Sequence, residues 1–443
     1  MDDKPLGLWS ATCLVVASMI GAGVYLTSGF SVFYLESREL VLVAWGVGGL
    51  IAVLGAVCYG ALARHIAESG GEYLFLSRTV HPAAGFVAGW VSLLAGFTGA
   101  VAFAARVLEE YLLPDAIRPD WLPSKTLAIT VVAVCGILHA FNVGRGAKTQ
   151  NSVVVLKLLL LTAFIMIAFG HHAVSGWPGL TGSPSNDVIV NRSLAAAFAS
   201  SLVFITFSYS GYNAAVYVAG EIRDPQRNVP LAMVAATLTV LVLYLLLNTV
   251  FLYAPPLERL LGAEPVPDIA AVAAHSIGGD RLSMGIRAII VLGLLTSVSG
   301  NVQAGPRVYA KMSEDGVFPS LFGFRGGAPR AAIFLQCAIS IVVIYFSTLE
   351  GLLEYLAFTL SLSTAGTVAC LFLLRKRQTA GRVTTSAWFL IIPAIYVLAI
   401  VGLAIVAAWG DKHQLTGTAV TVVTGLVAYW LLRIASRRRW VRR

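Results

Sequence analysis

The chain alternates between long apolar runs and short polar connections. A hydrocarbon core about 30 Å thick takes about 20 residues of α-helix to cross, and twelve runs reach or approach that length. None has the period-two alternation of a membrane β-strand. The pattern predicts an all-α membrane protein with twelve transmembrane helices. The spans are expected at residues 8–32, 40–63, 84–108, 126–142, 152–172, 194–219, 230–253, 282–311, 331–348, 351–374, 387–409 and 415–434.

Composition agrees with this pattern. Hydrophobic residues make up 58% of the 443 residues and charged residues only 12%, about half the charge of a typical soluble domain. Twelve helices and their connections nearly exhaust the chain, so a single polytopic domain, residues 1–443, is expected. The first apolar run continues as a full span without a small-residue cleavage site, so no cleaved signal is expected.

The basic residues are distributed unevenly between the two sides. With the N-terminus inside, 21 Lys and Arg lie on the inner side, 8 on the outer side and 2 within spans. Basic residues favour the cytoplasmic side, so both termini are predicted to be cytoplasmic, in the inner (plasma) membrane. The run from Arg437 to Arg443 is interpreted as a tail beside anionic lipid. This topology accounts for the net charge of +9 without nucleic acid as a partner.

Two halves of five spans each are expected, about 8–172 and 194–374, followed by two helices at about 387–434. Because five is odd, the second half must enter from the opposite face. The first helix of each half is interrupted by small residues, at Gly21-Ala22-Gly23 and at Ser208-Tyr209-Ser210-Gly211. Interrupted helices at matching positions indicate the substrate site of a transporter.

In the first span, the candidate binding residues are Ile20, Gly21, Ala22 and Gly23. Glycine weakens a helix and lets a ligand approach the backbone. If the helix breaks there, the free N–H groups at the start of the second half can hold a carboxylate. The alternative is close helix packing by small residues.

In the sixth span, the candidates are the polar and aromatic residues around the second interruption. Unwound carbonyls there can accept hydrogen bonds from an ammonium group. Phe207 is a candidate gate over the substrate, and Asn213 is a polar side chain at membrane depth, or else a link between helices. The candidate residues are Phe207, Ser208, Tyr209, Ser210, Gly211 and Asn213.

Lys157 interrupts the apolar run from Val153 to Leu161. An ionisable group inside the membrane is costly and is a functional hypothesis by default. Its position, roughly 8 Å from the cytoplasmic end of the span at 1.5 Å per residue, also allows the side chain to reach the interface. Depth alone leaves both interpretations open.

Acidic residues are expected outside the membrane interior. No Asp or Glu falls in the middle of a predicted span, which weighs against a cationic cargo. Arg106 is spaced to pair with Glu109 and Glu110 at the outer end of the third span. Glu221 is expected to pair with Arg223 or Arg227 in the connection after the sixth span.

The remaining chemistry is sparse. The five cysteines lie in apolar runs with no metal-ligand spacing, so neither a disulfide framework, a metal site nor a cofactor is expected. No catalytic grouping is found in any span, and an enzyme is not expected.

The motifs resemble those of the amino acid–polyamine–organocation (APC) superfamily, and within it the bacterial relatives of L-type amino acid transporter light chains. The first-span stretch Ser18–Tyr25 carries the likeness, together with three later segments. These are Ser69-Gly70-Gly71-Glu72-Tyr73 with Gly85–Trp90, then Phe207–Asn213 with Gly220–Pro230, and Arg307–Gly316.

The resemblance implies a LeuT-type fold of two inverted five-helix repeats plus two helices. It places a substrate α-carboxylate on the amides of Gly21, Ala22 and Gly23, and an α-ammonium on the carbonyls of Phe207 and Ser208. It also implies that Lys157 takes the place of a sodium ion and bridges to the first broken helix. Loop 109–125 has no cysteine, so no disulfide-linked heavy chain is expected.

We therefore expect a sodium-independent transporter of amino acids, neutral ones in particular, working by alternating access as an exchanger or with proton coupling. A carrier of cationic amino acids or amines is the alternative and would need a buried acidic group. A receptor that binds an amino acid without moving it is the alternative from another class. Membrane lipid is the only other partner expected.

Overall fold

The protein is described by a computed structural model. It describes residues 6–114, 117–141, 147–177, 194–262, 264–324, 328–379, 388–410 and 413–440. Within these ranges the protein is helical, and its only β-contact is an isolated parallel bridge between Leu6 and Ile222. The all-α prediction is confirmed. Outside the described residues lie the predicted span ends 142 and 387 and eight basic residues of the topology prediction: Lys4, Arg145, Arg192, Arg325, Arg382, Lys412, Arg442 and Arg443.

The helices follow the predicted spans closely. In chain order they are α1 Leu8–Met19, α2 Gly23–Leu35, α3 Arg38–His65, α4 Gly71–Thr79, α5 Pro82–Val91, η1 Ser92–Gly99, α6 Ala100–Leu112, α7 Thr126–Phe141, α8 Ala147–Ser175, α9 Leu194–Ser208, η4 Ala214–Glu221, α10 Pro225–Tyr253, α11 Leu257–Leu260, α12 Ile269–Glu314, η5 Ser320–Phe322, α13 Arg330–Phe346, α14 Leu349–Thr379, α15 Trp388–Gly410 and α16 His413–Trp440.

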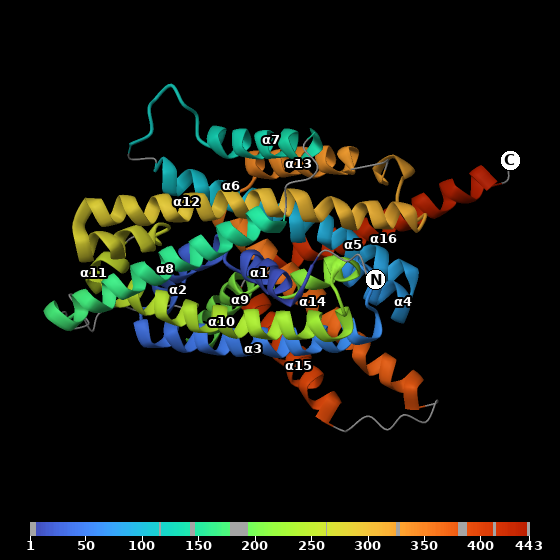
Figure 1. Cartoon of the computed structure of the whole chain (residues 1–443), viewed down its shortest axis with the longest axis horizontal. Coiled ribbons are helices and arrows are strands. Elements are labelled where there is room, and N and C mark those ends of the chain that lie inside the picture. The colour runs from blue at the N-terminus through green and yellow to red at the C-terminus, as the bar shows by residue number, and fades with distance from the viewer. Residues whose placement is uncertain are drawn as a thin grey trace.

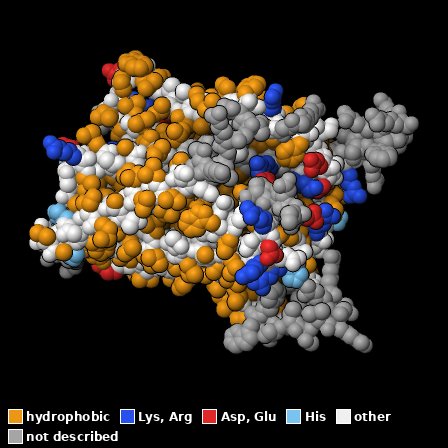
Figure 2. Space-filling model, viewed as in Figure 1, with side chains coloured by type: hydrophobic (Ala, Val, Ile, Leu, Met, Phe, Trp, Pro, Cys, Tyr) orange, Lys and Arg blue, Asp and Glu red, His pale blue; other side chains and the backbone are white. Residues whose placement is uncertain are grey.

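Nine helical stretches in the described ranges are long and apolar enough to cross a membrane, and α7, α9 and α13 are shorter apolar helices. Figure 2 shows hydrophobic side chains over most of one face, with acidic and basic side chains gathered mainly at its right-hand end. Large apolar side chains such as Leu159, Val242 and Leu398 are mostly exposed. Such a surface is suited to lipid rather than to water.

Local sequence signals explain where several helices begin. Ser37 caps α3, where its hydroxyl accepts the Leu40 N–H at 3.2 Å. His81 caps α5 in the same way, with Pro82 as the first helical residue. Both arrangements satisfy an N–H group that has no partner within the helix.

An inner group of helices places the two interruptions at the centre. The pair α1 and α2 contacts α9 and α10, and α3 packs along both α9 and α10. The long helix α12 lies beside α6 and η1, while α7 pairs with α13 in an outer layer at the top of Figure 1. Gly48 and Gly60 of α3 allow this close packing, since an added Cβ would lie within 3 Å of Ile205 and Pro230 respectively.

Two local features were not predicted. Helix α12 begins at Ile269 rather than 282, because a short helical segment precedes a break at Gly278–Gly279, where Gly279 has a φ of 62°. The third span contains the π-helical segment η1, Ser92–Gly99, between α5 and α6. A π-segment widens the helix locally and is frequent at functional sites.

Candidate functional site

The first span is broken where its two glycines predict. Helix α1 ends at Met19, and α2 begins at Gly23 after a bend through Ile20, Gly21 and Ala22. The first N–H groups of α2 have no partner within their own helix. The break therefore presents amide donors and the positive end of the α2 dipole inside the first span.

The sixth span is broken at the second predicted position. Helix α9 ends at Ser208, and the 3₁₀ segment η4 begins at Ala214 after a turn. Gly211 in this turn has a φ of 98°, a conformation that favours glycine because it has no Cβ. The turn leaves carbonyl groups at the end of α9 outside the regular helical pattern.

The two breaks pack directly on each other. A Cβ on Gly23 would lie 2.5 Å from Ser208 Oγ, and one on Gly211 would lie 2.7 Å from the Ser18 carbonyl oxygen. Thr27 and Ser208 share a hydrogen bond of 2.8 Å between their hydroxyls. Glycine is required at these positions because the two backbones approach within side-chain distance.

Tyr244 of α10 ties the breaks together. Its hydroxyl donates to the carbonyl oxygen of Met19 at 2.6 Å and lies 3.3 Å from that of Ser208. One phenol thus reaches the carbonyl ends of both α1 and α9. Sequence analysis missed this residue because a tyrosine within an apolar span resembles ordinary core.

Lys157 is buried, with 6% of its surface exposed. Its Nζ donates a hydrogen bond to the carbonyl oxygen of Ile20, at the end of α1. Gly293 of α12 leaves room for the side chain, since a Cβ there would lie 3.0 Å from Lys157 Cε. The lysine therefore points to the first break, as the resemblance implied, and not to the membrane interface.

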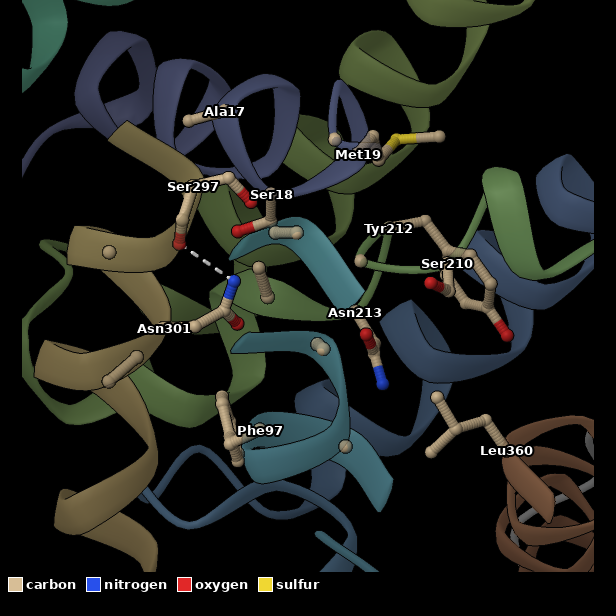
Figure 3. Close-up of a pocket in the computed structure, with 18 of the residues that line it drawn as sticks. Ala17, Ser18, Met19, Phe97, Ser210, Tyr212, Asn213, Ser297, Asn301 and Leu360 are labelled. Atoms are coloured by element: carbon tan, nitrogen blue, oxygen red, sulfur yellow. Dashed lines mark hydrogen bonds between the residues drawn. The ribbon is translucent and has the colours of Figure 1, made fainter. Parts of the chain in front are cut away.

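A pocket lies between the breaks, the third span and α12 (Figure 3). Its cavity volume of about 170 Å³ corresponds to five or six water molecules, enough for a small organic solute. Figure 3 shows Ser297 and Asn301 of α12 on one side, with Asn301 Nδ2 donating to the Ser297 carbonyl at 2.9 Å. Phe97 and Leu360 supply apolar wall.

Most of the predicted binding residues line this pocket. They are Gly21, Ala22, Gly23, Phe207, Ser208, Ser210, Gly211 and Asn213. The Phe207 ring also packs edge-on against Phe103, with ring centres 5.5 Å apart.

Ile20 and Tyr209 are not among the pocket-lining residues. The Ile20 carbonyl accepts from Lys157 instead. The Tyr209 ring packs on Trp45 and Tyr244, and its hydroxyl donates to the Trp45 carbonyl at 3.1 Å. The interruption is therefore in the predicted place, but these two side chains are directed into the protein.

Glu72 of α4 lines the pocket and was not among the predicted site residues. The sequence predicted no acid in the middle of any span. Glu72 instead belongs to the connection between the second and third spans, and this connection folds back into the helix bundle. Gly70 and Gly71, with φ of 144° and 58°, turn the chain inward before Glu72. Two glycines directly before an acid were the signal in the sequence.

The Glu72 carboxylate is held by neutral donors. Tyr59 donates to Oε1 at 2.5 Å and Asn213 donates to the same oxygen at 3.2 Å, while Ser363 lies 3.4 Å from Oε2. Burial raises the pKa of Glu72 above its ordinary value, although the hydrogen bonds from Tyr59, Ser363 and Asn213 oppose this shift. Asn213 thus connects the second break to a buried acid.

Two predicted ion pairs have different partners. Glu109 pairs with Arg118 at 2.7 Å rather than with Arg106, because the chain after α6 folds back over the helix end. Glu221 pairs with Arg307 of α12 at 2.7 Å, a partner outside its own connection. Neither partner lies at the short helical spacing on which the two predictions rested.

A family model described as amino acid permease matches residues 6–432. The chain belongs to the amino acid permease family. The resemblance to the APC superfamily is confirmed, and the protein is a permease rather than an enzyme.

Relatives of this permease are similar over most of its length. It is 25% identical to the b(0,+)-type amino acid transporter 1 of Mus musculus, over 97% of this chain and 88% of the relative. It is also 25% identical to the serine/threonine exchanger SteT of Bacillus subtilis (strain 168), over 84% of each chain. The large neutral amino acids transporter small subunit 2 of Mus musculus is 26% identical, over 97% and 81%.

The five cysteines of this permease are all free and buried. They are Cys13, Cys58, Cys135, Cys337 and Cys370. An intermolecular disulfide needs an accessible thiol with suitable geometry, and none of these thiols lies at the surface.

Proposed function

We propose that this permease is a sodium-independent transporter of neutral amino acids that works by alternating access, as an exchanger or with proton coupling. The observation that carries the proposal is the Lys157 ammonium on the Ile20 carbonyl. A fixed positive charge there stabilises the C-terminal end of the half-helix α1, as a bound cation does in other transporters.

The cargo backbone is assigned to the two breaks. Its α-carboxylate binds the amides of the first break, at Gly21, Ala22 and Gly23, and its α-ammonium binds the carbonyls of Phe207 and Ser208. Phe207 covers the bound cargo as a gate. The support for this assignment is that all five residues line one pocket and that the two helix ends have opposite dipole signs.

The proposal includes the two inverted five-helix repeats, about 8–172 and 194–374, with both termini cytoplasmic in the plasma membrane. The pairing of the breaks in α1/α2 and α9/η4 supports the repeats. The excess of basic residues on one side supports the orientation.

A cationic amino acid is the second candidate cargo, and Glu72 is the observation in its favour. A pocket for a cationic side chain needs an acid, and Glu72 lines the pocket. Competition by lysine or arginine against a neutral substrate would favour this candidate.

The test is uptake of radiolabelled amino acids into proteoliposomes, with and without internal amino acid, sodium and a proton gradient. We expect uptake that needs no sodium, rises with internal amino acid and is inhibited by neutral amino acids. Sodium dependence would overturn the coupling assignment. Binding without flux or counterflow would overturn transport and favour a receptor.

A further inference from the structure

Glu72 is the buried acid of the pocket, and its surroundings are unusual for a carboxylate. Only 3% of its surface is exposed. A buried carboxylate normally has a cationic partner or several strong donors, because removing its charge from water is costly. Among the described residues, every hydrogen bond that reaches it comes from a neutral group, namely a phenol, an amide and a hydroxyl.

Described charged groups of α12 and α4 have other partners. Helix α4 packs against α5, α12, α14 and η4. On α12, Arg307 pairs with Glu221 at 2.7 Å, and Lys311 lies 3.2 Å from Asp315. On α4 itself, Arg78 pairs with Glu68 at 3.4 Å on the exposed side.

The titratable side chains that feel the charge of Glu72 are neutral phenols on three other elements. They are Tyr59 of α3, Tyr212 and Tyr217 around η4, and Tyr396 of α15. His81 precedes α5, and its Nδ1 accepts a hydrogen bond from the Ala83 N–H at 3.1 Å. A proton is therefore the simplest positive charge that can neutralise the carboxylate in place.

The donors to Glu72 come from three elements other than its own. Tyr59 belongs to α3, Asn213 lies in the turn after α9, and Ser363 belongs to α14. If these elements shift relative to α4, the carboxylate loses donors and its affinity for a proton rises. A group whose proton affinity differs between conformations couples the proton to the conformational change.

We propose that Glu72 is the proton-binding site of the transport pocket. The carboxylate takes one proton from water on the side to which the pocket opens and returns it to water on the other side. No bond other than the O–H bond forms or breaks. The inference rests on the proposed function and names the coupling site that the proposed function leaves open.

The position of Glu72 supports this role. It lines the same pocket as the two breaks, and Asn213 bridges it to the second break through a bond of 3.2 Å. Burial raises the pKa of this carboxyl, so it holds a proton at a higher pH than an exposed glutamate does. Protonation thus alters the hydrogen bonds of a residue that itself lines the cargo site.

The experiment uses the full-length protein in proteoliposomes that contain a trapped pH dye. Wild type is expected to acidify the lumen during uptake, and its initial rate is expected to fall as external pH rises, because the carboxyl loses its proton. In Glu72→Gln, the uptake that remains is expected not to vary with pH and to carry no protons. The matched control Glu68→Gln, at an exposed acid, should keep the wild-type profile.

A second variant tests the inference without changing the acid. Tyr59→Phe removes a donor to the ionised carboxylate, so the proton affinity should rise and the falling limb of the pH profile should move up by about one pH unit. This result is informative even if Glu72→Gln does not fold.

Three results would overturn the inference. They are amino acid counterflow by wild type without proton movement, a pH profile in Glu72→Gln that matches wild type, and an unshifted profile in folded Tyr59→Phe. Absence of counterflow by wild type with every amino acid would instead overturn the proposed function.

Discussion

Lys157 and Glu72 are both ionisable, both almost fully buried and both close to a broken helix, yet they have opposite surroundings. Lys157 donates to a backbone carbonyl at the end of α1. Glu72 accepts from three side chains on three elements. The hydrogen bond of Lys157 therefore depends on the position of one helix end, whereas the hydrogen bonds of Glu72 depend on how several helices are arranged.

The difference suggests separate tasks. A lysine ammonium on a helix carbonyl places a positive charge where a metal cation would otherwise be needed. A carboxyl held by donors from separate elements is sensitive to their relative position. We therefore propose that Lys157 anchors the end of α1 and that Glu72 carries the exchangeable proton.

The largest effect is expected for Lys157→Ala. Loss of a charged hydrogen bond is worth roughly 1.5–3 kcal/mol, so the initial uptake rate should fall about ten- to a hundredfold. Leu159→Ala is the matched control, because Leu159 lies on the same helix and is exposed. Full activity in Lys157→Ala would show that transport does not need the lysine at the end of α1.

A somewhat smaller effect is expected for Gly23→Ala. The new Cβ would lie 2.5 Å from Ser208 Oγ and would force the two breaks apart, at an overpacking cost of about 1–3 kcal/mol. Both the thermal unfolding temperature in detergent and the uptake rate should fall. Gly46→Ala is the control, since a Cβ there meets open space. Equal behaviour of the two variants would mean that the breaks are not tightly packed.

Tyr244→Phe should reduce uptake about three- to tenfold. It removes the hydroxyl that reaches Met19 and Ser208, and a neutral hydrogen bond contributes roughly 0.5–1.5 kcal/mol. Tyr253→Phe, on the same helix but at an exposed site, is the control for loss of a tyrosine hydroxyl. Unchanged uptake in Tyr244→Phe would show that the breaks are held together by packing alone.

The smallest effect on transport is expected for Glu109→Gln. Glu109 is as buried as Glu72, but it pairs with Arg118 at 2.7 Å. The variant should lose about 1–3 kcal/mol of stability and keep the wild-type pH profile of uptake. A flattened pH profile in Glu109→Gln would mean that a buried acid makes uptake depend on pH even when it has a cationic partner.

Hydropathy and motif spacing were sufficient for the fold class. Span positions follow from the length of apolar runs, because each membrane helix satisfies its own backbone hydrogen bonds. The interruptions at Gly21–Gly23 and Ser208–Gly211 were also predictable, since glycine and clustered polar residues weaken a helix wherever it packs. Lys157 was identifiable because a single charge stands out in an apolar run.

The tertiary structure decided which groups face each other. Glu72 lies in a short polar connection, and only the inward turn at Gly70–Gly71 makes it part of the pocket. The pair of Glu221 with Arg307 and the double contact of Tyr244 likewise join residues on separate helices. The sequence by itself determined where helices form and break, because those preferences are local. Burial and pairing of the polar groups between helices depend on long-range packing, and only the folded chain specifies them.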